Sequence, residues 1–233
     1  MSVGAINARL LSAAELVRQG AVFADVGTDH AYLPLFLLDK GKIERAVCAD
    51  INVGPLNSAR ANAHEAGLSE KIEFVLCDGA ADLSGRGITD YAICGMGGEL
   101  IAAIIERAPH LKDGKINLIL QPMSRQGVLR KFLASSGFEI KCESYSSDSG
   151  KYYVTFLAHY TGCVTELDDA EAELGVKSAE FVNISAQICY LKAKLAAFIK
   201  QRDGKRLGGD NADKEELLVL KIDERIRMLQ ACE

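Results

Sequence analysis

Short apolar runs alternate with amphipathic stretches over the first two thirds of the chain. Each run has the length of a buried parallel strand, and apolar residues at helical spacing follow the runs. The pattern predicts strands at residues 21–25, 45–50, 71–76, 90–94 and 116–120. It predicts helices at residues 5–19, 33–39, 55–66 and 127–135, and one more after Gly98. This alternation is typical of a doubly wound α/β sheet.

The pattern changes after Gly137. Residues 138–143 and 152–159 have strand character, and no segment of helical length separates them. Ser147 to Gly150 supplies turn residues, so we expect an antiparallel hairpin at the end of the sheet.

Residues 163–233 follow a helical pattern instead. Apolar residues at alternating spacings of three and four predict the seam of a helix pair, beginning with Phe181, Ile184, Ile188, Leu191, Leu195 and Phe198. Residues 203–211 predict a loop, and a second helix covers residues 213–230. We therefore expect a coiled-coil-like helical hairpin appended to a domain formed by residues 1–162. The alternative is two helices that fold over the sheet.

Composition limits the class of protein. No apolar run approaches the roughly 20 residues of a membrane helix, and the N-terminus has no secretory signal pattern. The seven cysteines are scattered without a C-x-x-C pair, which indicates cytoplasmic thiols and no metal site. A net charge of −5 argues against a generally basic nucleic-acid binder but allows a local basic face. Nothing in the composition indicates protein partners.

Residues 24–34, Ala-Asp-Val-Gly-Thr-Asp-His-Ala-Tyr-Leu-Pro, form the turn between the first strand and its helix. In doubly wound domains this turn contacts the ligand beyond the carboxyl ends of the strands. Asp29 and His30 stand where a dinucleotide-binding turn has glycines, and an added carboxylate repels a pyrophosphate. The sulfonium and α-ammonium of S-adenosylmethionine suit an acidic turn better. The turn therefore favours a methyltransferase over a dehydrogenase.

Acids and glycines also follow the next strands, and parallel topology brings them to one edge of the sheet. The predicted cofactor-binding residues are Asp25, Gly27, Thr28, Asp29, His30, Asp50, Ile51, Asp78, Gly79, Gly95, Met96 and Gly97. A carboxylate at Asp50 is suited to accept both ribose hydroxyls, and Ile51 to cover the adenine ring. Asp78 is suited to accept from the adenine amine. The Gly95 turn leaves room for the methionine half and the substrate.

Four motifs resemble a known family. Residues 24–34, Gly54-Pro55, residues 95–101 and residues 120–123 are similar to the bacterial tRNA adenine-N1 methyltransferases known as TrmK, over most of residues 5–160. The resemblance implies a class I methyltransferase fold, a Rossmann-like sheet with a C-terminal helical extension, and methylation of adenine 22 in tRNA. Met123 and Val75 depart from the family, where asparagine and arginine are frequent.

Methylation of adenine N1 needs no proton removal, because the neutral ring nitrogen has a free lone pair, so catalysis is mostly in-line placement. Asp29 is the candidate catalytic residue, since its carboxylate is suited to orient the target amine and stabilise the positive product ring. The alternative is that it holds only the ammonium of the cofactor. His30 is expected to orient the cofactor or cap a local amide, and Tyr32 to stack on a flipped base or lie buried under the first helix.

A basic stretch supplies the candidate tRNA contacts: Lys192, Lys194, Lys200, Arg202, Lys205 and Arg206, with Arg125 and Arg130 near the mouth of the site. The alternative is a solvated charged face. The leading prediction is therefore a methyltransferase that acts on a tRNA adenine. The alternatives are a class I methyltransferase for a small molecule or another RNA, and a non-catalytic cofactor-binding module whose hairpin binds a partner.

Overall fold

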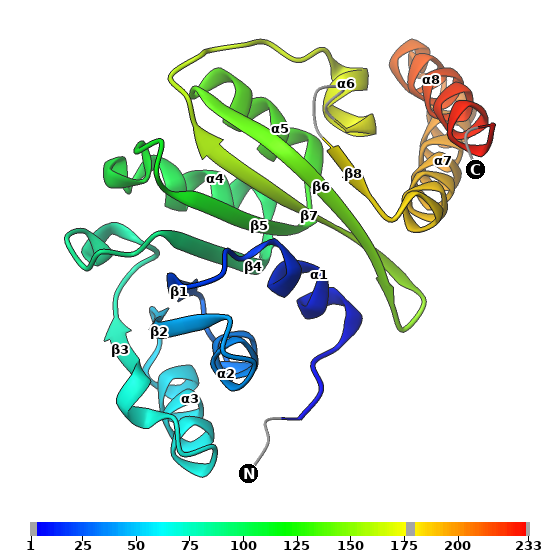
Figure 1. Cartoon of the computed structure of the whole chain (residues 1–233). Helices are drawn as coiled ribbons and strands as arrows, with labels where there is room; N and C mark the ends of the chain where they lie inside the picture. The colour runs from blue at the N-terminus through cyan, green and yellow to red at the C-terminus, as the bar shows by residue number, and fades with distance from the viewer. Residues whose placement is uncertain (1–3, 176–179, 232–233) are drawn as a thin grey trace.

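A single eight-stranded sheet organises the chain (Figure 1), and the computed structural model describes residues 4–175 and 180–231. The strand order is β3-β2-β1-β4-β5-β7-β6-β8. The strands are β1 (Ala21–Val26), β2 (Ile43–Asp50), β3 (Ile72–Leu76), β4 (Asp90–Gly97), β5 (Asn117–Ser124), β6 (Phe138–Asp148), β7 (Lys151–Tyr160) and β8 (Glu180–Val182). The five strands from β3 to β5 are parallel, and β7 is antiparallel to both of its neighbours. The five predicted parallel strands and the hairpin are confirmed.

Helices cover both faces of the sheet. The helices of the first part are α1 (Ala8–Leu16), α2 (Tyr32–Asp39), α3 (Val53–Glu65), α4 (Gly98–Glu106) and α5 (Gln126–Ser135), with short 3-10 turns η1 (Ser69–Lys71), η2 (Ala81–Leu83) and η3 (Pro109–Leu111). One core cluster joins α1, α2 and α3 to the sheet, and a second joins α4 and α5 to its other face. Apolar strands buried on both faces explain why the sequence shows them as continuous apolar runs.

The C-terminal part contains α6 (Asp169–Leu174), α7 (Ile184–Gly208) and α8 (Asp213–Gln230). The predicted second helix is confirmed, but the predicted loop at residues 203–211 is wrong, because α7 continues to Gly208. Lys205 Nζ contacts Glu215 Oε1 at 3.0 Å, so an ion pair with α8 supports the last turns of α7. A glycine inside a helix costs only about 1 kcal/mol. Gly209 follows the helix as its C-cap, and its φ of +79° is the left-handed conformation that glycine adopts easily.

Phe181 was expected on the first helix of the pair, but it lies in β8, which pairs with β6 in parallel. Asn183 caps α7 instead, accepting from the backbone N–H of Ala186 at 3.0 Å. The C-terminal segment thereby extends the sheet by one strand before it turns helical.

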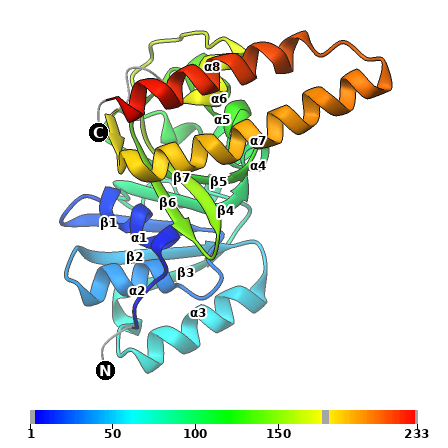
Figure 2. The ribbon, with the colours of Figure 1, turned by 90° about the vertical axis from the view of Figure 1, so that its right-hand side faces the viewer.

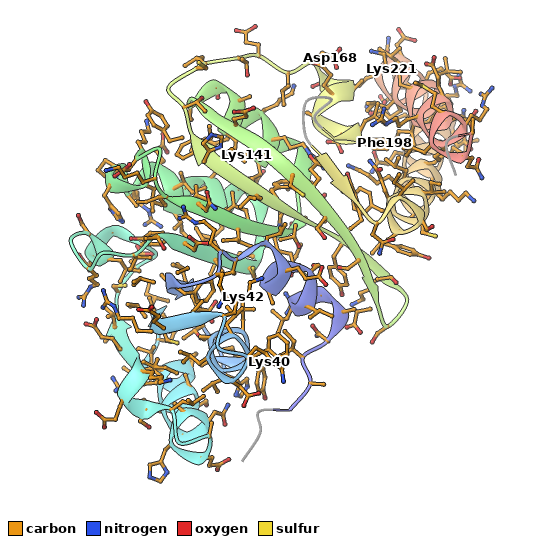
Figure 3. The ribbon with its side chains drawn as sticks, viewed as in Figure 1. Lys40, Lys42, Lys141, Asp168, Phe198 and Lys221 are labelled. Carbon is orange, nitrogen blue, oxygen red and sulfur yellow. The ribbon has the colours of Figure 1, made fainter. Side chains whose placement is uncertain are left out.

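The helical pair combines both arrangements that the sequence allowed. Ile188 and Leu191 of α7 and Ile222 and Ile226 of α8 belong to the same core cluster as β6 and β7. Asp168, the N-cap of α6, lies 3.6 Å from Lys221 of α8 and ties the two together (Figure 3). The far half of the pair projects beyond the sheet (Figure 2). Within the described residues, no helix has the length and apolarity needed to cross a membrane.

Candidate active site

The predicted site residues meet at the carboxyl ends of neighbouring parallel strands. β1 lies between β2 and β4, with Val26 opposite both Ala49 and Ile93. The backbone N–H groups of Gly27 and Thr28 donate to Ala49 O at 2.8 and 3.0 Å, so the first turn is fastened to the end of β2. In the same way Cys77 N donates to Asp50 O at 3.0 Å. The loops after β1, β2, β3 and β4 therefore form one edge, where α/β domains bind ligands.

The turn after β1 is stabilised by a buried hydrogen bond between a side chain of the turn and one near the end of the strand. Thr28 Oγ1 donates to Asp25 Oδ2 at 2.7 Å, and both residues are buried. Burial raises the pKa of Asp25 to about 6, against the lowering effect of the Thr28 hydrogen bond. Gly27 has a φ of +78°, and a Cβ there would collide with the Met96 side chain. The left-handed turn therefore favours glycine at this position, and a larger residue would also have to displace the end of the Met96 side chain.

Asp29, His30 and Tyr32 face outward from the same turn. The Asp29 side chain is 77% exposed and lies 3.5 Å from His30 Nε2. The His30 ring stacks on Tyr32 with centroids 5.1 Å apart, and Asn62 Nδ2 donates to His30 O at 2.9 Å. Tyr32 is 51% exposed, so its burial under the first helix is wrong. His30 therefore lies between the exposed Asp29 carboxylate and the exposed Tyr32 ring on the same turn.

The acids of the next two loops differ in their availability. Asp50 Oδ1 accepts from Asn52 N at 2.7 Å, which fixes the carboxylate at the end of β2, and Ile51 beside it is 62% exposed. Asp78 accepts from both terminal nitrogens of Arg107, at 2.6 and 3.3 Å. Arg107 was not expected in the site, because it lies at the end of α4, far along the sequence. A ligand amine at Asp78 would have to compete with this exposed ion pair.

The donor set fits S-adenosylmethionine. Carboxylates at Asp29, Asp50 and Asp78 follow three neighbouring strands, Asp25 lies buried beneath the first turn, and the exposed Ile51 offers an apolar surface to a purine. The site's acids match the two positive groups of the cofactor and its ribose hydroxyls. In the described part of the chain, no cluster of three or more His, Cys, Asp or Glu is placed to hold a metal ion.

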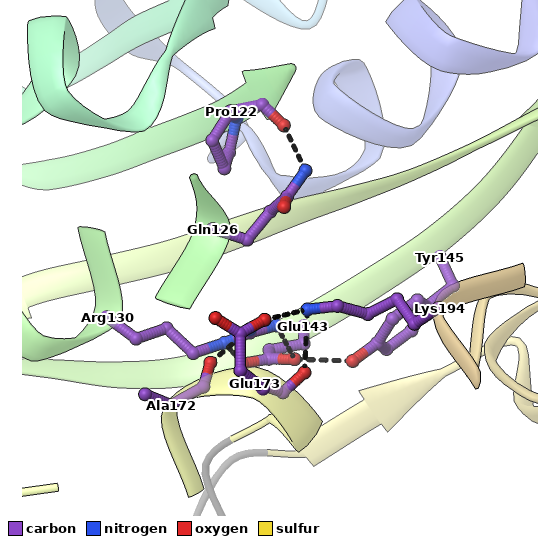
Figure 4. A network of polar contacts seen from close by, with 8 residues as sticks. All are labelled: Pro122, Gln126, Arg130, Glu143, Tyr145, Ala172, Glu173 and Lys194. Carbon is purple, nitrogen blue, oxygen red and sulfur yellow. Dashed lines mark hydrogen bonds and ion pairs between the residues drawn. The ribbon is translucent and has the colours of Figure 1, made fainter. Parts of the chain in front are cut away.

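The predicted RNA contacts fall into two groups. Arg130 is 0% exposed and is not a surface contact: it donates to Glu143 at 2.8 and 2.9 Å and to Ala172 O at 2.7 Å (Figure 4). The prediction that Arg130 binds RNA is wrong, because β6 and α6 close over this face of α5. Lys194 is also turned inward, to Glu173 (Figure 4).

The remaining cations differ in how far nearby acids neutralise them. Arg202 lies 2.9 Å from Asp203 and 3.5 Å from Glu216, and Arg206 also contacts Glu216 at 2.7 Å. With the Lys205 pair, most of the charge at the distal end of α7 is matched by acids. Lys192 and Lys200 are exposed on α7, and Arg125 is exposed before α5, where it lies 3.8 Å from the equally exposed Glu99.

Sequence reasoning missed Arg9. Its guanidinium Nη1 donates to Gln121 Oε1 at 2.7 Å and lies 3.8 Å from the position of a Cβ on Gly95. Arg9 precedes the first strand in the chain and belongs to no motif, so only the path of α1 across the sheet reveals it.

Comparisons with known proteins identify the domain and the family. A family model described as a methyltransferase domain matches residues 6–156. The tRNA (adenine(22)-N(1))-methyltransferase of Bacillus subtilis is 30% identical over 187 residues, which are 80% of this chain and 79% of that protein. The crystal structure of the B. subtilis M1A22 tRNA methyltransferase TrmK has a TM-score of 0.75 at 26% identity, over 97% of this chain and 98% of that chain.

Two solved relatives carry the cofactor or its product. The Streptococcus pneumoniae protein Sp1610 in complex with S-adenosyl-L-methionine has a TM-score of 0.75 and 31% identity, covering 95% of this chain and 97% of that chain. M. capricolum TrmK in complex with S-adenosyl-homocysteine has a TM-score of 0.71 and 29% identity, covering 96% of this chain and 95% of that chain. The chain belongs to the methyltransferase-domain family and, within it, to the TrmK family of tRNA (adenine(22)-N(1))-methyltransferases.

Proposed function

We propose that this chain transfers the methyl group of S-adenosylmethionine to N1 of adenine 22 in tRNA. The observation that carries the proposal is its family membership, with 30% identity to the Bacillus subtilis enzyme of that name over 80% of the chain. The acidic site beside two glycine turns supports the choice of cofactor. A tRNA substrate also implies the cytoplasm as the place of action.

The chain's own groups would hold the cofactor by complementary charge and shape. Asp50 would accept from the ribose hydroxyls, and Ile51 would cover one face of the adenine. Asp78 would accept a hydrogen bond from the adenine amine in place of its ion pair with Arg107. An exposed ion pair contributes only about 0–1 kcal/mol, so that exchange costs little. Gly95 and Gly97 would leave the space that the methionine half needs.

Bound S-adenosylmethionine supplies an electrophilic methyl group. The protein's task is then placement, because adenine N1 already carries the attacking lone pair. The exposed carboxylate of Asp29 would accept from the amine of the target base and stabilise the positive charge that develops on its ring. The exposed ring of Tyr32, on the same turn, would stack on the extruded base.

The helical pair is the proposed grip on the tRNA backbone. It lies on the side of the molecule toward which β4 and β5 run (Figures 1 and 2), the same side as the candidate active site. Lys192 and Lys200 are exposed on α7, and Arg125 is exposed at the start of α5. These side chains would contact phosphates and thereby position the tRNA without reading its sequence.

A transfer assay tests the proposal. Purified protein is incubated with methyl-labelled S-adenosylmethionine and an unmodified tRNA transcript, and a transcript with guanine at position 22 serves as the control. We expect label in the first tRNA alone and a reverse-transcription stop at position 22. Label in a small-molecule extract but in neither tRNA would favour the small-molecule methyltransferase. Cofactor binding without transfer to any acceptor would favour the non-catalytic module.

The role of Asp29 is tested by separating turnover from binding. We expect Asp29→Ala to lower kcat by about a hundredfold or more, the usual effect of removing one group that stabilises transition-state charge. Calorimetry should show little change in the affinity for S-adenosylhomocysteine. Equal losses in kcat and affinity would make Asp29 a cofactor ligand only.

A further inference from the structure

We propose that Arg9 binds the α-carboxylate of the methionine half of S-adenosylmethionine and that Gln121 positions it for this contact. The proposal rests on the cofactor of the proposed function. It assigns the one charge of that cofactor that none of the predicted site residues matches.

The Arg9 side chain is held at the site by a buried amide. Gln121, near the end of β5, is 0% exposed, and its Oε1 accepts from Arg9 Nη1 at 2.7 Å. Its Nε2 donates to Arg9 O at 2.8 Å and to Thr155 Oγ1 at 2.7 Å. The amide therefore grips both the backbone and the guanidinium of Arg9. These hydrogen bonds hold the Arg9 side chain beside the Gly95 turn and restrict its motion in solvent.

The guanidinium keeps donors to spare. A guanidinium has five N–H donors, and one hydrogen bond from the Arg9 guanidinium, to Gln121, is seen within the described residues. No carboxylate of these residues lies within 4.0 Å of it. The other arginines at this edge are engaged, Arg107 with Asp78 and Arg125 with Glu99 at 3.8 Å. Arg9 is thus a half-buried cation at the site whose fork remains available for an anion.

Charge complementarity selects the anion. The site presents carboxylates to the ammonium and the sulfonium, and these same carboxylates would repel the α-carboxylate of the cofactor. Arg9 is close enough to Asp25 to lower the pKa of that buried carboxyl, against the larger raising effect of burial. Its guanidinium therefore faces the Gly95 turn and the turn after β1, which begins at Gly27 beside Asp25. These two loops are expected to enclose the amino-acid half of S-adenosylmethionine. The planar guanidinium is also the group that binds carboxylates through two parallel hydrogen bonds.

A pair of ligands isolates this contact. S-Adenosylhomocysteine carries the amino-acid half, whereas 5′-methylthioadenosine keeps the nucleoside and the thioether but lacks the carboxylate. We expect Arg9→Ala to weaken S-adenosylhomocysteine binding about 10- to 100-fold by calorimetry, the range of a charge-assisted bidentate contact. The affinity for 5′-methylthioadenosine should stay within about twofold. Arg9→Lys, which keeps the charge but not the fork, should give an intermediate loss for the first ligand alone.

Controls separate this contact from folding and from RNA binding. Arg227→Ala removes an exposed arginine on α8 and should change neither affinity. Gln121→Leu should lower the affinity for S-adenosylhomocysteine more than that for 5′-methylthioadenosine, because a free guanidinium is less well placed. Equal weakening of both ligands by Arg9→Ala and Arg9→Lys would show a structural role and overturn the proposal. Unchanged S-adenosylhomocysteine binding with weaker tRNA binding would make Arg9 a phosphate contact. Wild-type binding without tRNA methylation would contradict only the proposed function.

Discussion

Replacing Arg130 by methionine tests how the C-terminal segment is fastened to the catalytic sheet. Arg130 joins α5 to β6 through Glu143 and to α6 through Ala172 O, and its guanidinium lies 4.7 Å from the centroid of Phe156. Burial is the largest single influence and lowers the pKa of Arg130, but the charge and hydrogen bonds of Glu143, together with Tyr145 and Tyr190, raise it by more, so the guanidinium stays charged. Both side chains of the ion pair are 0% exposed. Methionine fills much of the volume but removes every one of these polar contacts.

The cost follows from the charge that is left behind. Breaking a buried ion pair by removing one partner costs about 3–5 kcal/mol, because the other charge stays desolvated. For a chain of this length, such a loss lowers Tm by about 6–20 °C. The assay is urea unfolding followed by circular dichroism, with a thermal scan as the second readout. Below its Tm, Arg130→Met should bind tRNA with an unchanged salt dependence, since Arg130 does not reach the surface.

A matched apolar variant tests whether the unpaired Glu143 carboxylate causes the loss of stability in Arg130→Met. Tyr145 Oη also donates to Glu143, at 2.5 Å, so the variant replaces all three residues: Arg130→Met, Glu143→Leu and Tyr145→Phe. Apolar replacement of a buried ion network is often neutral, but Ala172 O loses its donor in this variant as well, so we expect stability within about 1–3 kcal/mol of wild type and above that of the single variant. A single variant that loses less than about 1 kcal/mol, or a triple variant as unstable as the single one, would refute the reasoning.

Three further predictions concern the site and the helical pair. Burial raises the pKa of Asp25 to about 6, so the folded protein keeps a proton there that the unfolded chain releases near pH 4. The free energy of unfolding therefore falls as the pH rises from about 4 to about 6. In urea unfolding, Asp25→Asn should be up to about 3 kcal/mol more stable than wild type at pH 7 and equal to it near pH 4. The double variant Lys192→Ala/Lys200→Ala should reduce the slope of log affinity for tRNA against log salt concentration by about 1–2. Lys40→Ala, at the far end of α2, should leave this slope unchanged. Equal slopes for wild type and the double variant would show that α7 is not in the tRNA interface. Gly27→Ala should cost at least about 1–2 kcal/mol of stability and weaken S-adenosylhomocysteine binding, because φ is +78° there, and full affinity in calorimetry would contradict the geometry of the turn.

The fold could be predicted because its signals are local. A buried parallel strand appears as a continuous apolar run, and the acid or glycine that ends it appears directly afterwards in the sequence. Topology then brings residues such as Asp50 and Gly95 to one edge without further information. The end of α7 could not be predicted in this way, because the residues around Gly204 have the composition of a loop. Only their pairing with the acids of α8 supports the helix.

Positive charges proved harder to place than negative ones, and the reason is physical. The acids of the site sit on turns whose position the sheet fixes, so their exposure follows from their place in the chain. The arginines sit on helices, where a long side chain turns toward whichever carboxylate or carbonyl the tertiary structure supplies. Arg130 is buried because Glu143 and Ala172 O satisfy it, and Arg9 reaches the site because Gln121, 112 positions away, holds it there. Such pairings are long-range, so a basic residue within an amphipathic helix predicts a binding surface only once its acidic neighbours in space are known.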